Sequence, residues 1–427
     1  MIPSSAILFL VSLLINTALV FFPHNPMPPK TGAHKRGLEM LAALRSLGIK
    51  ATLTSSIDTS ETAWTQGSID LLLGDYVTAV HVYENQAIDR WHEKLLERYY
   101  RHFNLEPPVN SALHSPLGMR RWFRKLCNQI QPDLIIMNYA YWDGLIDHRK
   151  QRRSFRLIDS LDLLSIHSAR KRQLTKELAK NDVDNKGADS DHMLQENYYD
   201  SFPTAVDPHE LAIYDKYDCT LAISLHEARI ISQGTNNTHV ELLKMSHGVV
   251  SVENSYSDGA LFTTGPNIFN LQGYYYFVRR VLPIILKSDP SFRLIVTGHI
   301  GSEIKVQNSR GIELLGFVPN LTQYYERARF AICPVFGGTG QQIKIIEAMA
   351  HGLPVIALHS AAEASPIKDG INGLVAKDAD EFASQAIVLW QDQALCRRLG
   401  AAARKTIATE CSPEINVALL RAILEVC

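Results

Sequence analysis

The clearest pattern of apolar and polar positions lies between residues 330 and 358. An apolar run from Phe330 to Val335 is typical of a strand buried on both faces, and Gly337 to Gly340 form a glycine-rich turn after it. The next apolar residues recur at three and four positions, as on one face of a helix: Ile343, Ile345, Ile346, Met349 and Ala350. Gly352 and Pro354 end this helix, and Val355 to Leu358 predicts a second buried strand.

This strand, turn, helix and strand favour an anion-binding site. Glycines let the backbone approach a ligand closely, and a helix N-terminus offers unpaired N–H groups and about half a positive charge. Lys344 adds a positive charge one turn into the helix, and Glu347 follows on the same helical side. A carboxylate suits the vicinal hydroxyls of a ribose. The plain alternative is a βαβ unit with a surface Glu–Lys pair, but both residues at these spacings favour a nucleotide-sugar pocket.

The stretch GTGQQIKIIEAMAHGLPVIA, residues 338–357, resembles the donor-binding motif of retaining GT-B glycosyltransferases of the group 1, or family 4, type. It is most similar to the branch with the motif GTGxKxKxxEAxAxGxPVV. Two positions differ from the family. Thr339 stands where the wider family has a Glu, and the branch motif also has a Thr there. Gln342 replaces the first Lys of the branch motif.

The remaining apolar runs predict further buried strands, separated by helices and loops. They are Thr17–Phe22, Ile49–Thr54, Val77–Tyr83, Pro132–Tyr139, Phe155–Asp162, Cys219–Ser224, His239–Lys244, Leu261–Thr264, Arg293–Gly298 and Ile312–Gly316. A chain of 427 residues exceeds the usual single core, which makes two domains the default. The resemblance implies an α/β fold of the GT-B type, with two Rossmann-like domains facing a cleft.

The expected organisation has four parts. Residues 1–16 are an apolar extension, 17–247 an acceptor domain, 248–410 a donor domain and 411–427 a helix that crosses back to the first domain. Residues 176–208, polar and weakly periodic, are expected to form a long loop or lid. The apolar run at residues 6–22 admits three interpretations, namely a signal-anchor, an extension that leads into the first strand, or a start codon placed too early. We favour the second or third, because no Lys or Arg precedes the run.

Composition is that of an ordinary globular protein, with 46% hydrophobic and 20% charged residues. A net charge of −1 gives no general attraction to nucleic acid. The six cysteines form no CxxC pair, which argues against a zinc ribbon or disulfide scaffold and fits a reducing compartment. We expect a cytoplasmic protein, with membrane association at the inner face left open.

The resemblance also suggests residues outside the central stretch. His24, Asn25 and Asp159 are acceptor-side candidates, and Gly32 is a donor-binding candidate at the cleft. Asp159 has an alternative role as a strand-end cap. In the segment LIDSLDLLS the branch has a His where this chain has Leu161. Asp162 or a nearby histidine, His167 or His24, would have to take over its role, or the activity is altered.

On the donor side, the resemblance places Gly265 and Val318 beside the nucleotide. Many relatives have an Arg and a Lys in the loop at Gly265, and this chain has neither, so Lys344 and backbone N–H groups carry more of the phosphate contact. The donor-binding set is Gly32, Gly265, Val318, Gly338, Thr339, Gly340, Lys344 and Glu347, and the catalytic set is Asp162, Lys344 and Glu347.

Two further stretches have a chemical interpretation. Met119–Ile130 mixes basic and aromatic residues and is either a basic amphipathic helix on an anionic membrane or, somewhat favoured, a surface helix with its aromatics packed inward. Asp189-Ser190-Asp191 is formally a DxD, but in a polar loop it indicates composition rather than a metal site. We expect no metal and no cofactor.

The resemblance therefore implies transfer of a sugar from a nucleoside diphosphate sugar to an acceptor hydroxyl, with retention at the anomeric carbon. From the family, the acceptor is a saccharide or lipid-linked and the pathway makes cell-surface polysaccharide or glycolipid. One alternative is a GT-B binding or scaffold subunit with a degraded site, favoured by Leu161 and Gln342. Another is a same-fold epimerase or hydrolase of nucleotide sugars.

Overall fold

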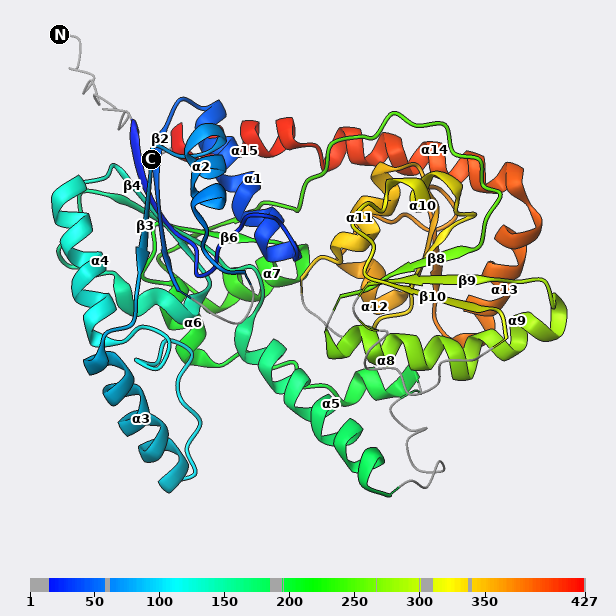
Figure 1. Ribbon diagram of the computed structural model, residues 1–427, viewed down its shortest axis with the longest axis horizontal. Coiled ribbons are helices and arrows are strands. Elements are labelled where there is room, and N and C mark those ends of the chain that lie inside the picture. The colour runs from blue at the N-terminus through cyan, green and yellow to red at the C-terminus, as the bar shows by residue number, and fades with distance from the viewer. Residues whose placement is uncertain are drawn as a thin grey trace, which may run out of the picture. The chain divides into compact units, whose positions relative to one another are not determined.

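The computed structural model describes residues 15–57, 62–184, 194, 196–265, 267–298, 300, 310–336 and 340–425. Helices and strands alternate along this part of the chain (Figure 1). The strands form two sheets, and the strands whose registers are resolved pair in parallel. This arrangement explains the continuous apolar runs, since helices cover both faces of a parallel sheet.

The first sheet has seven strands in the order β3-β2-β1-β4-β5-β6-β7. Its strands are β1 Thr17–Phe21, β2 Lys50–Ser56, β3 Ala79–Tyr83, β4 Leu134–Asn138, β5 Phe155–Asp159, β6 Cys219–Ala222 and β7 His239–Leu242. The order reverses beside β1, and such switch points are where open α/β sheets bind ligands. The accompanying helices are α1 Gly32–Ser46, α2 Gln66–Asp75, α3 Ala87–His102, α4 Leu117–Ile130, η1 Ala140–Leu145, α5 Leu164–Asp184, η3 Glu196–Ser201, α6 Pro208–Tyr214 and α7 Leu225–Gly234.

The second sheet has six strands in the order β10-β9-β8-β11-β12-β13. Its strands are β8 Ala260–Thr263, β9 Leu294–Thr297, β10 Ile312–Gly316, β11 Ala331–Cys333, β12 Val355–Leu358 and β13 Leu374–Ala376. The accompanying helices are α8 Ile268–Tyr276, the π-helical turn η4 Phe277–Val281, α9 Leu282–Ser288, α10 Thr322–Arg327, α11 Ile343–Ala350, α12 His359–Glu363, α13 Ala379–Gln391, α14 Gln393–Glu410 and α15 Pro413–Glu425.

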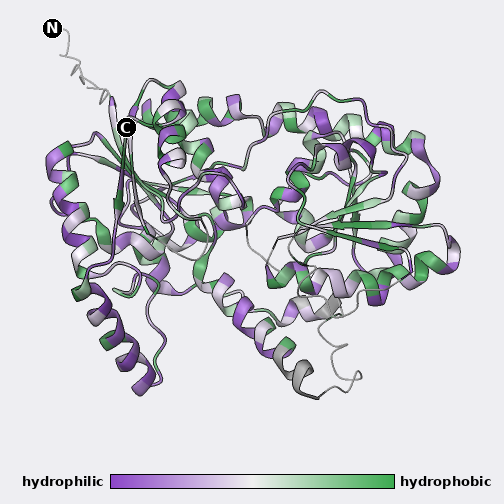
Figure 2. Ribbon diagram, in the orientation of Figure 1, coloured by the Kyte–Doolittle hydropathy of each residue, from purple (hydrophilic) through white to green (hydrophobic). Residues whose placement is uncertain are grey.

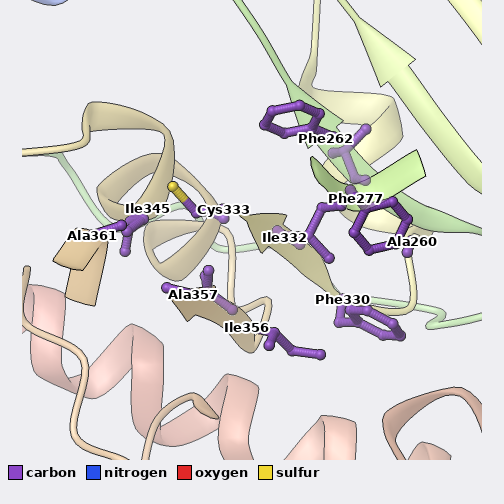
Figure 3. Packing of buried hydrophobic residues seen from close by; sticks show 14 of the residues in the cluster. Ala260, Phe262, Phe277, Phe330, Ile332, Cys333, Ile345, Ile356, Ala357 and Ala361 are labelled. Carbon is purple, nitrogen blue, oxygen red and sulfur yellow. The ribbon is translucent and has the colours of Figure 1, made fainter. Parts of the chain in front are cut away.

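Buried apolar side chains form a continuous core around the second sheet. Side chains of adjacent strands meet there, among them Phe262, Ile332 and Ile356, and helix residues such as Phe277 and Ile345 complete it (Figure 3). Cys333 is fully buried in this core, as expected for a small core residue.

The chain divides into two compact units. Of the described residues, 15–159, 217–219 and 416–425 belong to the first unit, and 160–216 together with 220–415 to the second. The boundary expected at residue 248 stays a prediction. Within the described residues, no helix is both long and apolar enough to span a bilayer. Residues 1–14, which include the first part of the N-terminal apolar run, lie outside the described residues.

The expected strands are confirmed, with ends that differ by a few residues. A first correction concerns the loop expected at residues 176–208. Residues 176–184, assigned to a long loop, are the last turns of α5, and Glu196–Ser201 form η3. Leu174, Leu194, Tyr198 and Phe202 are buried in the core of the second unit. The helix was missed because its charged and alanine residues favour helix without an amphipathic pattern. Asp189 to Asp191 lie outside the described residues.

A second correction concerns the strand expected at Phe155–Asp162, which ends at Asp159. Leu161 has a φ of +59°, a left-handed conformation that no strand accommodates. The chain therefore turns sharply just before Asp162. The side chain at 162 consequently lies in a loop between β5 and α5 rather than in the sheet.

Candidate functional site

Lys344 lies in the first turn of α11, directly after the glycine-rich turn. Its ammonium donates a short hydrogen bond to Oδ1 of Asn270 and lies 5.4 Å from the centroid of the Phe262 ring. Burial lowers the pKa of Lys344 below that of an ordinary lysine, and the nearby Cys333 thiol opposes this shift. The cation is thus held among apolar groups with one neutral hydrogen-bond acceptor, an environment that an anionic ligand would relieve.

Asn270 connects this lysine to the loop at Gly265. Its amide nitrogen donates to the carbonyl of Gly265, at 3.1 Å, while its oxygen accepts from Lys344. Asn267 caps α8, since its side chain accepts from the amide of Phe269. The loop that lacks the Arg and Lys of many relatives is therefore tied to Lys344 through Asn270. Sequence reasoning missed Asn270, because nothing in the local pattern marks it.

Glu347 follows one turn later on α11 and is 8% exposed. One oxygen of its carboxylate lies 3.4 Å from the hydroxyl of Tyr325, which is buried on α10. The Tyr325 ring stacks on His351, with centroids 4.5 Å apart, and His351 Nδ1 lies 2.8 Å from the carbonyl oxygen of Glu347. Burial raises the pKa of Tyr325 to about 12, so its hydroxyl stays protonated and able to donate at neutral pH. This arrangement fixes the direction of the Glu347 carboxylate.

Gly340 is in direct contact with Asp162. Its N–H donates to Oδ1 of Asp162 at 3.1 Å. A Cβ at position 340 would lie 2.9 Å from that oxygen and 3.2 Å from the carbonyl of Leu161, so only glycine fits without a shift. His167 Nδ1 lies 3.8 Å from the other oxygen of Asp162, and its ring packs against Phe269. The expected sites Asp162 and Gly340 are therefore adjacent, with a histidine beside them.

Other donor-side candidates occupy loops and termini. Val318 is half-buried in the segment between β10 and α10. Gly265 has room for a larger side chain, since the nearest atom to an added Cβ is 3.9 Å away. Gly32 begins α1, where the side chain of Thr31 accepts from the amide of His34. Gly338 and Thr339 lie outside the described residues.

The acceptor-side candidates belong to the first unit, together with Gly32. Asp159 is fully buried and forms a two-point ion pair with Arg36 of α1, with distances of 2.8 and 3.2 Å. Asn25 is also buried and uses its amide for the carbonyl of Ala63 and the hydroxyl of Ser68. The ring centroids of His24 and His34 lie 6.2 Å apart. Arg36 was missed by the sequence analysis, because its partner is more than a hundred residues away.

Among the described residues, no cluster of three or more His, Cys, Asp and Glu side chains is arranged to hold a metal ion. The described part of the site includes two positive elements, the Lys344 ammonium and the N–H of Gly340.

A family model matches the part of the chain that contains Lys344 and Glu347. Residues 258–392 match the model of the family described as "Glycosyl transferases group 1". This segment, about a third of the chain, is therefore similar to the group 1 glycosyltransferases. It contains Lys344, Glu347, Gly340 and Asn270. A curated relative, an uncharacterized 44.6 kDa protein in the cps region of Klebsiella pneumoniae, is 25% identical over 128 residues. That match covers 28% of this chain and 33% of the relative, so the chain aligns with about a third of its length.

Solved structures extend the likeness to the whole fold. Sucrose-phosphate synthase of Thermosynechococcus elongatus has a TM-score of 0.61 at 15% identity and covers 96% of this chain and 98% of its own. A complex of S. aureus TarM with fondaparinux, alpha-GlcNAc-glycerol and UDP has a TM-score of 0.64 at 9% identity, over 96% and 100% of the two chains. Pneumococcal O-GlcNAc transferase GtfA, in complex with UDP and GlcNAc, has a TM-score of 0.62 at 11% identity, over 96% and 99%. The fold is that of the GT-B glycosyltransferases.

Proposed function

We propose that this protein transfers a sugar from a nucleoside diphosphate sugar to an acceptor hydroxyl, with retention at the anomeric carbon. The observation that carries the proposal is the arrangement at the start of α11, where Gly340 lies just before the helix and Lys344 and Glu347 follow within its first turns. An anion-binding end and a diol-binding carboxylate at this spacing match the two ends of a nucleotide diphosphate. The domain match at residues 258–392 supports the same assignment.

The proposed chemistry is electrostatic. As the sugar leaves, the diphosphate gains negative charge, and the Lys344 ammonium with the N–H of Gly340 would stabilise it. Each preorganised donor of this kind contributes about 3 kcal/mol. Lys344 needs no reorganisation, because Asn270 already holds its ammonium in place. No metal is needed in this scheme, since the protein supplies the positive field.

Glu347 would bind the ribose hydroxyls, with Tyr325 fixing its carboxylate. Asp162 is proposed to receive a hydrogen bond from the sugar or the acceptor once the donor has taken over the N–H of Gly340. His167, 3.8 Å from Asp162, is suited to tune that carboxylate in place of the family histidine that Leu161 replaces. The acceptor is proposed to be a saccharide or lipid-linked, in the synthesis of cell-surface polysaccharide or glycolipid, with peripheral contact to a membrane.

Calorimetric titration with UDP and GDP tests the donor pocket. The similar structures of TarM and GtfA are complexes with UDP, which makes UDP the first nucleotide to try. We expect micromolar binding of one nucleotide and a loss of roughly 10- to 100-fold in Glu347→Ala, as for a hydrogen bond to a charged group. Glu363→Ala, an exposed glutamate on α12, is the matched control and should bind as the wild type does.

The same experiment separates the alternatives. Absence of binding to either nucleotide would reject the transferase in its UDP and GDP forms and favour a binding subunit with a degraded site, an alternative that Leu161 supports because it offers no polar group. Where binding is found, incubation with UDP-sugar without an acceptor follows. Turnover without acceptor would indicate an epimerase or hydrolase instead of a transferase.

A further inference from the structure

Helix α3 has an exposed apolar stripe. Ile88, Trp91, Leu95, Tyr99 and Phe103 follow one another at spacings of three, four, four and four residues, which places them on one side of the helix. Their exposed fractions run from 49 to 62%. Such a contiguous run of large apolar side chains in water indicates an interaction surface rather than scattered surface residues.

Basic residues line one edge of this apolar stripe. Arg90, Lys94, Arg98 and Arg101 recur at spacings of four, four and three residues beside it, and all four are exposed. The neighbouring α4 adds exposed Arg121 and Lys125. Figure 2 accordingly shows α3 as largely hydrophilic, interrupted by hydrophobic positions. An apolar stripe rich in Trp, Tyr and Phe beside a basic edge is the pattern of a helix that lies in a membrane interface.

The first turn of α3 is anchored to the rest of the first unit by hydrogen bonds. Of the residues of α3, all of which the structure describes, only Asp89 is buried. The Asp89 carboxylate accepts from the amides of Gln86 and Gly118, at 3.0 and 2.8 Å, and from the hydroxyl of Tyr83. Beyond this anchor α3 projects from the rest of the first unit (Figure 1). The stripe is therefore presented in a fixed direction without cover from the described residues of its own unit.

We propose that the stripe on α3 docks the protein on the surface of an anionic lipid bilayer. Both the apolar stripe and the basic edge fit this partner. The apolar side chains would enter the acyl boundary, and the basic side chains would contact lipid phosphates. A second copy of the chain fits less well, since antiparallel pairing of two α3 helices would bring their basic edges together. The site expected from sequence was Met119–Ile130, but Met119, Phe123 and Leu126 of that helix are buried. The membrane-facing element is thus α3, with α4 as a basic neighbour.

Vesicle sedimentation of the full chain tests the proposal, independently of glycosyl transfer. We expect binding to vesicles of phosphatidylcholine and phosphatidylglycerol in equal parts, and little binding to phosphatidylcholine alone. Trp91→Ala with Leu95→Ser should weaken binding by about tenfold or more for each side chain removed. Lys94→Gln with Arg98→Gln should weaken it by about fivefold for each charge removed. Ile371→Ser with Val388→Ser, at exposed positions of the second unit, is the matched control and should bind as the wild type does.

A second measurement reports insertion itself. The tryptophan emission of the wild type should shift to shorter wavelength with the anionic vesicles, and this shift should be absent in Trp91→Phe, which still sediments. Equal sedimentation of wild type and Trp91→Ala/Leu95→Ser, or no preference for anionic vesicles, would overturn the proposal. A change in molar mass in solution caused by the same substitutions, without any vesicle binding, would show that the stripe joins copies of this chain and would overturn it as well.

Discussion

At the scale of single residues, the candidate site depends on ionisable groups in confined surroundings. Lys344 is held between Asn270 and Phe262, and Glu347 between the backbone of its helix and Tyr325. Neither side chain is arranged as a surface charge whose partner is water. The chemistry of each should therefore respond to pH and to small changes in its neighbours, and two predictions follow from this environment.

The first concerns the pH dependence of nucleotide binding. Burial lowers the pKa of Lys344, and a diphosphate binds the protonated form better than the neutral one. Affinity for UDP should be highest below this pKa and fall by up to about tenfold per pH unit as pH rises through it. The fall should begin at a lower pH than an ordinary lysine would allow. Calorimetric titration from pH 7 to pH 10 measures the slope.

Lys344→Gln provides the comparison for that slope. The variant should bind UDP more weakly at pH 7 and lose the decline at alkaline pH, because its side chain does not titrate. Lys377→Gln, at an exposed lysine of the second unit, should retain the wild-type profile. An unchanged slope in Lys344→Gln would assign the titration to another group.

The second prediction concerns Tyr325 as a positioning residue. Tyr325→Phe removes the hydroxyl 3.4 Å from the Glu347 carboxylate but keeps the ring that stacks on His351. The loss of one hydrogen bond should weaken UDP binding by about 2- to 10-fold. Since Glu347 is proposed to bind ribose hydroxyls, the preference for UDP over 2′-deoxy-UDP should also shrink. Tyr324→Phe, the neighbour on the same helix, should change neither quantity.

At the scale of elements, buried parallel strands were predictable and their long-range partners were not. Continuous apolar runs such as Val355–Leu358 mark strands covered on both faces, and the structure confirms β12 there. The length of α5 was not predictable, because its buried side is a sparse set that includes Ile166, Arg170 and Leu174. The candidate site was likewise predictable only in part, because some of its residues are connected by long-range contacts. The motif gave Lys344 and Glu347, whereas Asn270, Tyr325 and Arg36 act through contacts that only the folded chain creates.

A third prediction concerns the turn after β9, where Gly298 has a φ of +103°. An added Cβ would come within 1.9 Å of the carbonyl oxygen of Thr264, which is backbone and cannot rotate away. Gly298→Ala should therefore displace the loops that follow β8 and β9. A strained backbone alone costs roughly 1–3 kcal/mol, and the substitution should destabilise the protein by more than that. Thermal unfolding followed by circular dichroism measures the loss.

Gly316→Ala separates sterics from backbone strain in that experiment. Gly316 has a φ of +66°, but an added Cβ there meets no atom within 4 Å. It should cost only about 1–2 kcal/mol, the penalty of the left-handed conformation. Equal destabilisation by the two substitutions would mean that the contact with Thr264 is relieved by an easy shift of the loop.

At the scale of the whole molecule, two sheets with separate cores should respond differently to mutation and to ligand. Arg36 and Asp159 are buried together in the first unit, whereas Lys344 and Glu347 belong to the second. Removing one partner of a buried ion pair leaves the other charge unpaired and costs about 3–5 kcal/mol. Binding of UDP at a hundred times its dissociation constant stabilises the native state by about 2.7 kcal/mol. The two perturbations should therefore act on different parts of the unfolding profile.

Arg36→Met tests this division. It should lower the midpoint temperature of the transition in which the first unit unfolds by roughly 10 °C in a calorimetric scan, while UDP still binds with wild-type affinity. UDP should raise the other transition in both proteins. Arg36→Met with Asp159→Leu should recover much of the lost stability, because an apolar pair leaves no buried charge. A single transition shifted equally by the mutation and by UDP would show that both sheets unfold as one cooperative body, and the stability of the donor site would then depend on the Arg36–Asp159 pair as well.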